Sequence, residues 1–471
     1  MGTIWQRIKQ HVFLNPPPPR VQLFFIATVI KTFCDIIYWL VSATHFQLLA
    51  ACSSVVLLLW ICLMLAMAIP QTDNLLIRTQ RWLKPAYKIS LVILVFAIGV
   101  QFLVVSTFMA WNTIDRDSLP PVAHGIIAPF TTPYDASALT MQAVENLLAS
   151  KNPYAHANVV DALKDFPDVY NMLTPLRTGA FADSFPYPDQ EELKNFWHAA
   201  ITNPDVIPPE IESRVNYPAG SFLLLAPFVA LGISDMRIIL IIFTIPAIIY
   251  AARRMHPHQR WYFILGILLS IEFLNTIFTI NTKLLSLSFV MIGWLMASRR
   301  PWLSAILMGI AVATKQTAWF LLPFYIILIW KTAGIRPAIR SGITIGTVFL
   351  IINAPFIIAN PQLWLSSVLG PMIDPMFPLG HGFVSLVIAG IIPFDSSIFF
   401  ALLEITAFAG CILWYIRYAS RYPHAGLILA VIPLYFAWRS LSSYFFFVDV
   451  MLLSTILIQE KQRLRISETQ T

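Results

Sequence analysis

Long apolar segments recur along almost the whole chain, and they constrain the fold more than any other feature. Segments of this kind are long enough to cross the roughly 30 Å hydrocarbon core of a bilayer as helices. Only 12% of the 471 residues are charged, against about 25% in a soluble globular protein. The sequence therefore predicts an all-α polytopic membrane protein with about twelve transmembrane helices. The expected spans are residues 22–44, 47–70, 88–111, 237–252, 261–280, 283–298, 302–313, 316–331, 341–359, 398–417, 424–438 and 441–458.

Basic residues orient these spans. They cluster in short connections between spans, which is the pattern typical of cytoplasmic loops. The polar region 112–216 then lies on the extracytoplasmic side, and it holds 14 of the 24 acidic residues but only six basic ones. Three parts follow: the cytoplasmic N-terminus with the first three spans in 1–111, an extracytoplasmic domain in 112–216, and the remaining bundle in 217–471. The apolar segment 217–233 is predicted to be a short helix that dips in from the outer face, since a full crossing there would move the next basic cluster outside.

The extracytoplasmic domain is predicted to hold short amphipathic helices that lie in the membrane interface, after residue 135, near 157–172 and near 189–200. The first belongs to the stretch YDASALTMQAVENLLASKNPY, residues 134–154, whose apolar residues fall at helical spacing. Asp135 stands at its N-cap position, where a carboxylate accepts backbone N–H bonds. A simple cap is one interpretation of Asp135, and a general base at the membrane edge is the other.

Three basic side chains are predicted at the outer ends of spans: Lys283, Lys315 and Arg439. The positive-inside rule disfavours cations there unless they have a partner. As a set they are candidates for binding a phosphate, since arginine binds phosphate oxygens through two N–H groups. Each one alone could also be a snorkelling side chain. His381, between two glycines in an outer loop, could bind an acceptor or a phosphate, or could be an interfacial residue.

Metal, nucleotide and disulfide chemistry have little support in the sequence. Asp115 and Asp117 could ligate a divalent metal through carboxylate oxygens, with a solvated turn as the alternative. No cofactor is predicted. The four cysteines all lie in expected spans, which leaves no disulfide framework and no cysteine metal site. No glycine-rich phosphate loop follows a strand, and the +7 charge arises from inter-helix loops, so nucleic acid is not expected as a partner.

Ionisable residues inside the expected spans are functional candidates by default. Lys31 and Asp35 are one helical turn apart, and they are predicted to neutralise each other as a structural pair. Glu272, Glu404 and Asp449 are intramembrane acids for which the sequence identifies no partner.

Several motifs, taken in order, resemble one group of membrane enzymes. An acid precedes an apolar helix that ends in Asn-Pro-Tyr, residues 152–154; the next apolar run begins YPAGSFLLLAPF, residues 217–228; and AVATKQ, residues 311–316, follows a glycine-containing helix. This order resembles the polytopic glycosyltransferases of the GT-C superfamily, and within it glycosyltransferase family eighty-seven and its mannosyltransferase-like relatives. Ala219 stands where the family often has a second proline, and residues 281–283 read Asn-Thr-Lys where relatives often have Gly-Gln-x-Asn.

The resemblance implies a GT-C-like bundle and a transfer reaction. Such enzymes move a sugar, here a hexose such as mannose, from a polyprenyl-phosphate carrier to a hydroxyl of a glycan, lipid or protein acceptor. The reaction would invert the anomeric centre on the extracytoplasmic face of a bacterial or archaeal plasma membrane, with Asp135 as the general base. The departing phosphate of such a donor needs cations, and Lys315, Arg439 and Lys283 are predicted to bind it. Tyr154, Tyr217, Gln316 and His381 are predicted as substrate-binding residues.

Two other functions fit the same composition. A transporter or flippase for a lipid-linked or amphiphilic solute would also use intramembrane acids and a deep cavity, although the sequence has no pseudo-symmetric halves. A non-catalytic assembly subunit would use the acidic outer domain to dock a partner. Covalent sugar transfer, transport without covalent change, and the absence of donor-lipid binding distinguish the three.

Overall fold

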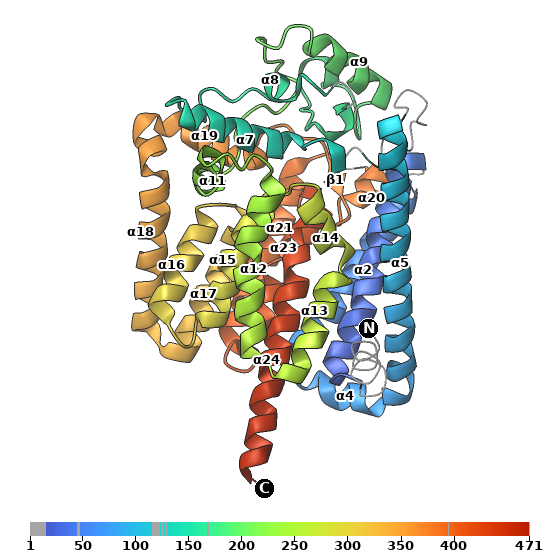
Figure 1. Ribbon diagram of the computed structural model, residues 1–471, viewed down its shortest axis with the longest axis vertical. Helices are drawn as coiled ribbons and strands as arrows, with labels where there is room; N and C mark the ends of the chain where they lie inside the picture. Colours follow the sequence, from blue (N-terminus) through green and yellow to red (C-terminus); the bar gives the residue numbers. More distant parts are fainter. Residues whose placement is uncertain are drawn as a thin grey trace.

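In the computed structural model the chain is a mostly helical bundle with one small pair of strands (Figure 1). The structure describes residues 16–44, 48–114, 123, 127, 130–166, 169–393 and 395–470. Its helices are of very unequal length, because prolines, glycines and polar residues interrupt many of the apolar segments.

The elements fall into three groups along the chain. The N-terminal group is α2 (Pro19–Thr44), α3 (Leu48–Ala68), α4 (Thr72–Arg78) and α5 (Gln80–Ile114). The polar region contributes α7 (Asp135–Leu148), α8 (Val159–Leu163), η2 (Tyr170–Met172), η3 (Gly179–Phe181) and α9 (Gln190–Ala200). The third group is α10 (Gly220–Leu223), α11 (Ala226–Ala230), α12 (Met236–Arg254), η4 (Pro257–Gln259), α13 (Arg260–Leu268), α14 (Ile271–Phe278), α15 (Lys283–Met296), α16 (Pro301–Val312), α17 (Thr317–Ala333), α18 (Ile335–Ala359), α19 (Pro361–Ile373), β1 (Leu379–Gly380), α20 (Ser385–Ile388), α21 (Ser397–Tyr418), α22 (Ala425–Leu429), α23 (Ile432–Tyr435), β2 (Arg439–Ser440), η5 (Ser442–Tyr444) and α24 (Phe446–Gln470).

Within the described residues, six helices are long and apolar enough to cross a membrane: α3, α5, α12, α18, α21 and α24. The helices α13 and α14 make a seventh span if they count as one, although the chain bends by 61° between them. The prediction of an all-α polytopic membrane protein is therefore confirmed at this level, and α2 covers the first expected span.

The predicted number of about twelve spans is not confirmed. The spans expected at 283–298, 302–313 and 316–331 are α15, α16 and α17, with 14, 12 and 17 residues, whereas a crossing helix needs about 20. The span expected at 424–438 is wrong as a single helix, because it is divided into α22 and α23, of five and four residues. Residues 217–233 form α10 and α11, of four and five residues, and helices this short do not cross a bilayer.

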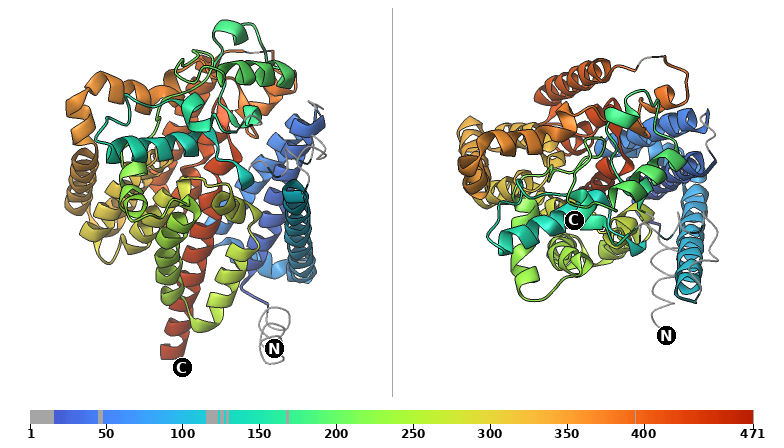
Figure 2. Two further views of the ribbon diagram at one scale, coloured as in Figure 1. Left: turned by 45° about the horizontal axis from the view of Figure 1, so that its top comes forward. Right: turned by 90° about the horizontal axis from the view of Figure 1, so that it is seen from above.

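The elements of the polar region gather at one end of the bundle, and residues 130–216 are here named the cap. Figure 1 shows α7, α8 and α9 together at the end opposite the C-terminal part of α24, and Figure 2 shows the cap helices lying across that end. The helices predicted after residue 135 and near 189–200 are α7 and α9. The helix predicted near 157–172 is interrupted, since it consists of α8 and the separate turn η2.

A short parallel pairing fixes two loops at the cap end of the bundle. The strand β1 pairs with β2, Leu379 opposite Arg439 and Gly380 opposite Ser440. Gly380 has a φ of 116°, and a β-carbon there would lie 2.1 Å from the carbonyl oxygen of Ser440. Only glycine permits this backbone conformation and approach. An isolated antiparallel β-bridge between Leu176 and Met376 joins the cap to the segment before β1. The cap and the two strands therefore form one connected region.

Candidate functional site

Asp135 lies at the start of α7, where the cap meets the bundle (Figure 1). Tyr134 is the N-cap residue and Asp135 is the first residue of the helix, so the predicted N-cap position is wrong by one residue. The Asp135 side chain is 9% exposed, and its Oδ1 accepts a hydrogen bond from the Ala136 N–H at 2.5 Å. Ser137 Oγ donates to the carbonyl of Ile280 at 2.8 Å, which ties this end of α7 to the connection before α15.

Burial makes the Asp135 carboxylate a stronger base than an exposed aspartate. Loss of hydration raises its pKa, while hydrogen bonds with Thr174 and Ala136 and the positive charge of Arg439 limit the rise. A carboxylate whose pKa is moved upward, toward the working pH, is better suited to accepting a proton during a reaction. Thr174 belongs to the cap and Arg439 to β2, so two segments far apart in sequence act on this one carboxyl group.

Two motifs that are about a hundred residues apart in sequence meet in the structure. The N–H of Gly220 donates to the Ala313 carbonyl at 2.8 Å, and the Gln316 side-chain amide donates to two backbone carbonyls, one of them that of Asn216. A β-carbon on Gly220 would lie 2.5 Å from the Ala313 oxygen, so a glycine is needed for this approach. The sequence motifs YPAG and AVATKQ therefore form one structural unit at the C-terminal end of α16.

Lys315 lies in the connection between α16 and α17 and is 4% exposed. Its Nζ donates to Thr282 Oγ1 at 2.9 Å and lies 3.3 Å from the centroid of the Tyr217 ring. Among the described residues no carboxylate forms an ion pair with it. Burial lowers the pKa of the Lys315 ammonium well below its usual value, the charge of Lys283 lowers it further, and that of Asp135 opposes the change. An anion bound beside Lys315 would therefore favour its protonated form.

Lys283 begins α15 and is also buried. Its ammonium group donates to Ser443 Oγ and lies 4.4 Å from the centroid of the Tyr444 ring. In the part of the chain that the structure describes, Lys283 forms no ion pair, and its charge acts on Lys315. A mostly apolar cleft between α15, α17 and α24 is lined by Lys283, Ser286, Leu287, Val290, Thr317, Ala318, Leu321 and Phe447.

Arg439 is the first residue of β2, and its backbone pairs with β1. Its Nη1 is buried and has no hydrogen-bond partner among the residues described. The charge of Arg439 acts on the Asp135 carboxyl group and on the hydroxyls of Tyr187, Tyr217 and Tyr444. A guanidinium group with an unused N–H in a buried position is suited to binding an oxyanion.

Three residues of this region were not identified from the sequence: Thr174, Tyr187 and Tyr444. Burial raises the pKa of Tyr187 to about 12, so its hydroxyl remains a hydrogen-bond donor at neutral pH. All three lie in loops or single turns, where hydrophobic periodicity gives no information. The only available signal was the position of Tyr187 between two prolines, which is typical of many turns.

The connection before α15 carries backbone strain. Ile280 has a φ of 58°, and this left-handed conformation costs a β-branched residue about 1–3 kcal/mol. The Ile280 carbonyl accepts the Ser137 hydroxyl, and the N–H of Lys283 donates to Asn281 Oδ1 at 3.1 Å. The strained turn thus lies between the start of α7 and Lys283. The strained residue directly precedes residues 281–283.

Tyr154 and His381, two of the predicted substrate contacts, are each 3% exposed. The Tyr154 hydroxyl donates to the carbonyl of Tyr217 at 2.8 Å. The backbone N–H of His381 donates to β2, and its Nδ1 lies 3.4 Å from Cys34 Sγ. His381 is therefore not exposed at a loop surface. Direct contact with substrate by Tyr154, Gln316 or His381 stays a prediction.

Asp115 and Asp117, the two candidate metal ligands in the sequence, lie outside the described residues. In the described ranges, no group of three or more His, Cys, Asp or Glu side chains is placed to hold a metal ion.

Comparison with known proteins gives one match. The sequence model of glycosyltransferase family 87 matches residues 216–438, which include the YPAG and AVATKQ motifs, Lys283 and Lys315. Asp135 and Arg439 lie outside the matched residues. No curated protein matches, and no solved structure matches. The match and the long apolar helices together support a membrane-embedded glycosyltransferase that is similar to family 87 over residues 216–438.

Proposed function

We propose that the enzyme transfers a hexose, such as mannose, from a polyprenyl-phosphate carrier to an acceptor hydroxyl, with Asp135 as general base. The observation that carries this proposal is the grouping of one buried carboxylate with the buried Lys283 and Lys315 and the half-buried Arg439, none of which forms an ion pair within the described chain. Asp135 interacts electrostatically with Arg439 and with Lys315, and Lys315 with Lys283. A carboxylate beside unpaired cations suits a reaction in which a proton is removed while a phosphate departs.

The cations support a phosphate-bearing donor. Burying a cation without a partner is costly, and proteins usually pair or neutralise it. Within the described residues, Arg439 keeps a buried N–H without a partner, and Lys315 contacts a hydroxyl and an aromatic ring but no carboxylate. Phosphate oxygens would satisfy both groups, the guanidinium through two parallel hydrogen bonds. The same charges would stabilise the negative charge that grows on the phosphate as it leaves.

The cleft between α15, α17 and α24 supports a lipid carrier. It is lined mainly by apolar side chains, and Lys283 lies on its wall. In this proposal the isoprenoid unit next to the phosphate packs against this apolar wall, and the phosphate lies beside the lysine. A nucleotide-sugar donor would instead need a site for a base and a ribose, and the sequence contains no nucleotide-binding loop.

The charge distribution supports an extracytoplasmic site. Arg253 and Arg254 end α12, and Lys331 lies in the last turn of α17. Figure 1 shows these helix ends on the side of the bundle away from the cap. Cytoplasmic loops carry an excess of lysine and arginine, so the cap and Asp135 would face the opposite compartment. Polyprenyl-phosphate sugars are donors that function without a nucleotide-sugar pool there.

The proposed step is a single displacement. The acceptor oxygen forms a bond to the anomeric carbon as the bond from that carbon to the phosphate oxygen breaks. The acceptor proton passes to Asp135, and the bonding electrons leave on the polyprenyl phosphate, which keeps its charge near Arg439 and Lys315. Attack opposite the leaving group inverts the anomeric centre.

Reconstituted transfer assays test the donor and the cation role together. Purified protein in proteoliposomes is given polyprenyl-phosphate hexose or the matching nucleotide sugar, with a lipid or glycan acceptor. We expect transfer from the lipid donor only. Arg439→Gln should lower kcat/KM about 10- to 100-fold, since a hydrogen bond to a charged group contributes about 1.5–3 kcal/mol. Arg177→Gln is the control, because Arg177 pairs with Asp395, whose side chain is 62% exposed.

Two results would refute the proposal. Transfer from the nucleotide sugar would exclude the lipid donor. Movement of the lipid-linked sugar across the vesicle membrane without any covalent product would instead favour the transporter or flippase.

A further inference from the structure

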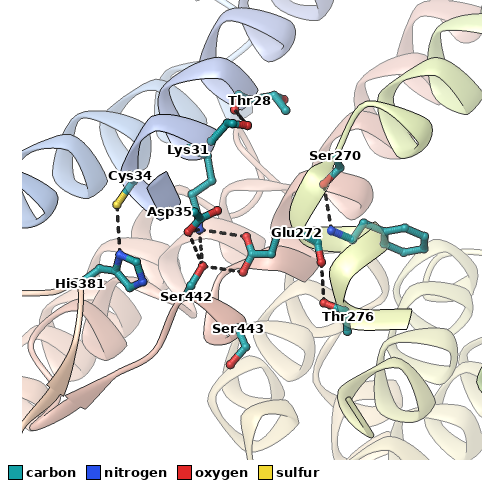
Figure 3. A network of polar contacts seen from close by, with 12 residues as sticks. Thr28, Lys31, Cys34, Asp35, Ser270, Glu272, Thr276, His381, Ser442 and Ser443 are labelled. Carbon is teal, nitrogen blue, oxygen red and sulfur yellow. Dashed lines mark hydrogen bonds and ion pairs between the residues drawn. The ribbon is translucent and has the colours of Figure 1, made fainter. Parts of the chain in front are cut away.

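An ionic network around the buried Lys31 lies between α2, α14 and the turn after β2 (Figure 3). Lys31 Nζ lies 3.0 Å from Asp35 Oδ1, 2.9 Å from Glu272 Oε2 and 2.6 Å from Ser442 Oγ. Ser442 Oγ lies 2.7 Å from Asp35 Oδ1 and 2.9 Å from Glu272 Oε1. The sequence predicts only the Lys31–Asp35 pair, on one helix, whereas the structure adds Glu272 from α14 and Ser442 from η5. These four residues are named the Lys31 network.

The hydroxyl of Ser442 has three polar neighbours and one proton. Its oxygen can accept two hydrogen bonds and donate one. Lys31 donates to the Ser442 oxygen, and the Ser442 hydroxyl can donate to either carboxyl group. Ser442 therefore joins a cation and an acid of α2 to an acid of α14.

Ser442 belongs to the segment that carries the proposed phosphate-binding groups. Residues 439–444 are here named the phosphate turn. Arg439 begins it. Ser443 Oγ accepts a hydrogen bond from the Lys283 ammonium group, which also lies over the ring of Tyr444. The backbone of the turn is short and tight, since the Tyr444 N–H donates to the Leu441 carbonyl at 2.9 Å.

The phosphate turn is held at two points. At its start, the Ser440 carbonyl accepts the N–H of His381 at 2.9 Å, next to the pairing of β1 with β2. In its second half, the only side-chain anchor to α2 and α14 within the described residues is Ser442. The His381 ring also reaches α2 through Cys34 Sγ at 3.4 Å. The helix α2 therefore contacts both sides of the turn.

We infer that the Lys31 network positions the phosphate turn for donor binding, so that Lys31, Asp35, Glu272 and Ser442 are positioning residues of the transfer reaction. This inference rests on the proposed function. The network does not touch the donor in this scheme. It fixes Ser442, which lies three residues after Arg439 and directly before Ser443. Misplacement of a catalytic group by about 1 Å can cost about 10²-fold in rate. A phosphate turn that is less firmly positioned should therefore bind the donor phosphate more weakly.

The test compares three serine variants in the full-length protein. Ser442→Ala removes the hydroxyl, and Ser442→Thr keeps it. Ser454→Ala is the matched control, because Ser454 is a buried serine of α24 whose hydroxyl donates only to the Met451 carbonyl at 2.7 Å. The measurements are kcat and KM for polyprenyl-phosphate hexose, and the Kd of polyprenyl phosphate without sugar.

The donor KM is the decisive readout, because a fraction of unfolded enzyme lowers the maximal rate but leaves KM unchanged. We expect Ser442→Ala to raise the donor KM and the polyprenyl-phosphate Kd about tenfold, and Ser442→Thr to restore both to within about threefold of wild type. Ser454→Ala should match wild type. Unchanged KM and Kd in Ser442→Ala would overturn the inference, whether or not its melting temperature falls.

The same experiment separates the two levels of the argument. If wild-type protein binds polyprenyl phosphate and transfers the hexose while Ser442→Ala is unaffected, only the positioning role fails. If wild-type protein neither binds polyprenyl phosphate nor uses its hexose ester, the proposed function itself fails.

Discussion

Replacing Asp135 by asparagine isolates the proton-accepting role of the carboxylate from its structural contacts. The amide has nearly the same shape, and its oxygen can still accept the Ala136 N–H that Asp135 Oδ1 accepts at 2.5 Å. It cannot accept a proton from the acceptor hydroxyl. General-base catalysis contributes about 10²–10⁴-fold, which corresponds to about 2.7–5.4 kcal/mol of the activation barrier. We therefore expect kcat of Asp135→Asn to fall by this factor while the Kd of polyprenyl phosphate stays close to wild type.

The pH dependence follows from the direction of the pKa shift. Burial raises the pKa of Asp135 above the ordinary aspartate value, and a general base is active only when ionised. Activity of the wild-type enzyme should therefore fall as the pH decreases through this raised pKa, at higher pH than an exposed aspartate would require. The Asp135→Asn variant should lack this acid limb in its residual activity.

Stability should change in the opposite direction to activity. Because the folded-state pKa is raised, the native protein holds the Asp135 proton more tightly than the unfolded chain does. Its contribution to stability is present below the unfolded pKa and is lost as the pH rises through the folded pKa. At pH above the folded pKa the buried carboxylate is destabilising, so Asp135→Asn should melt at a higher temperature than wild type there. The difference should shrink as the pH is lowered.

A transfer assay and a melting curve across pH check this reasoning. Asp161→Asn is the control, because the Asp161 side chain is 48% exposed and forms a surface ion pair with Lys164, which is worth little. Wild-type turnover in Asp135→Asn would exclude Asp135 as the base. A large loss of activity together with a lower melting temperature at high pH would show that the carboxylate stabilises the fold, which contradicts the effect of burial described above.

Three further changes test other parts of the structure. Lys315 should take up a proton when polyprenyl phosphate binds, because its lowered pKa rises beside an anion. The measured binding enthalpy should then depend on the ionisation enthalpy of the buffer, and this dependence should be smaller in Lys315→Met. Gly220→Ala should destabilise the protein by about 1–3 kcal/mol, because its β-carbon would lie 2.5 Å from the Ala313 oxygen, and a melting temperature equal to wild type would contradict this. In the Lys31 network, Lys31→Met should destabilise the protein by about 3–5 kcal/mol, because Asp35 and Glu272 would lose the cation that they share; a melting temperature equal to wild type would contradict this.

The sequence predicts the features that depend on local patterns. Apolar runs gave the long helices α3, α5, α12, α18 and α21, since about 20 residues are needed to cross a bilayer and these runs supply them. The helical spacing after residue 134 predicted the start of α7 to within one residue. The motifs around Gly220 and Lys315 were recognisable because each is contiguous, and the structure adds the contact that joins them.

The breaks in the helices could not be predicted from hydropathy. Residues 261–280 are mostly apolar, yet α13 and α14 meet at a bend of 61°. The reason lies in side-chain contacts: Ser270 Oγ accepts the N–H of Phe273 and begins a new helix, while Glu272 pairs with Lys31 of α2. A local pattern does not contain a partner about 240 residues away. The parallel pairing of β1 with β2 is hidden for the same reason, since each strand has only two residues.

Buried lysines in this protein illustrate how the structure separates stability from function. Lys31 and Lys315 have nearly equal exposure, 3% and 4%. Lys31 contacts two carboxyl groups and a hydroxyl, so its charge is matched and nothing more is needed to stabilise it. Among the described residues Lys315 contacts Thr282 and the Tyr217 ring, beside the further cation Lys283, so a positive charge on Lys315 costs free energy unless an anion is bound. A bound anion would remove this cost. Lys315, which has no carboxylate partner among the described residues, is therefore the lysine expected to bind the phosphate, whereas Lys31, which has two, is expected to hold the phosphate turn in position.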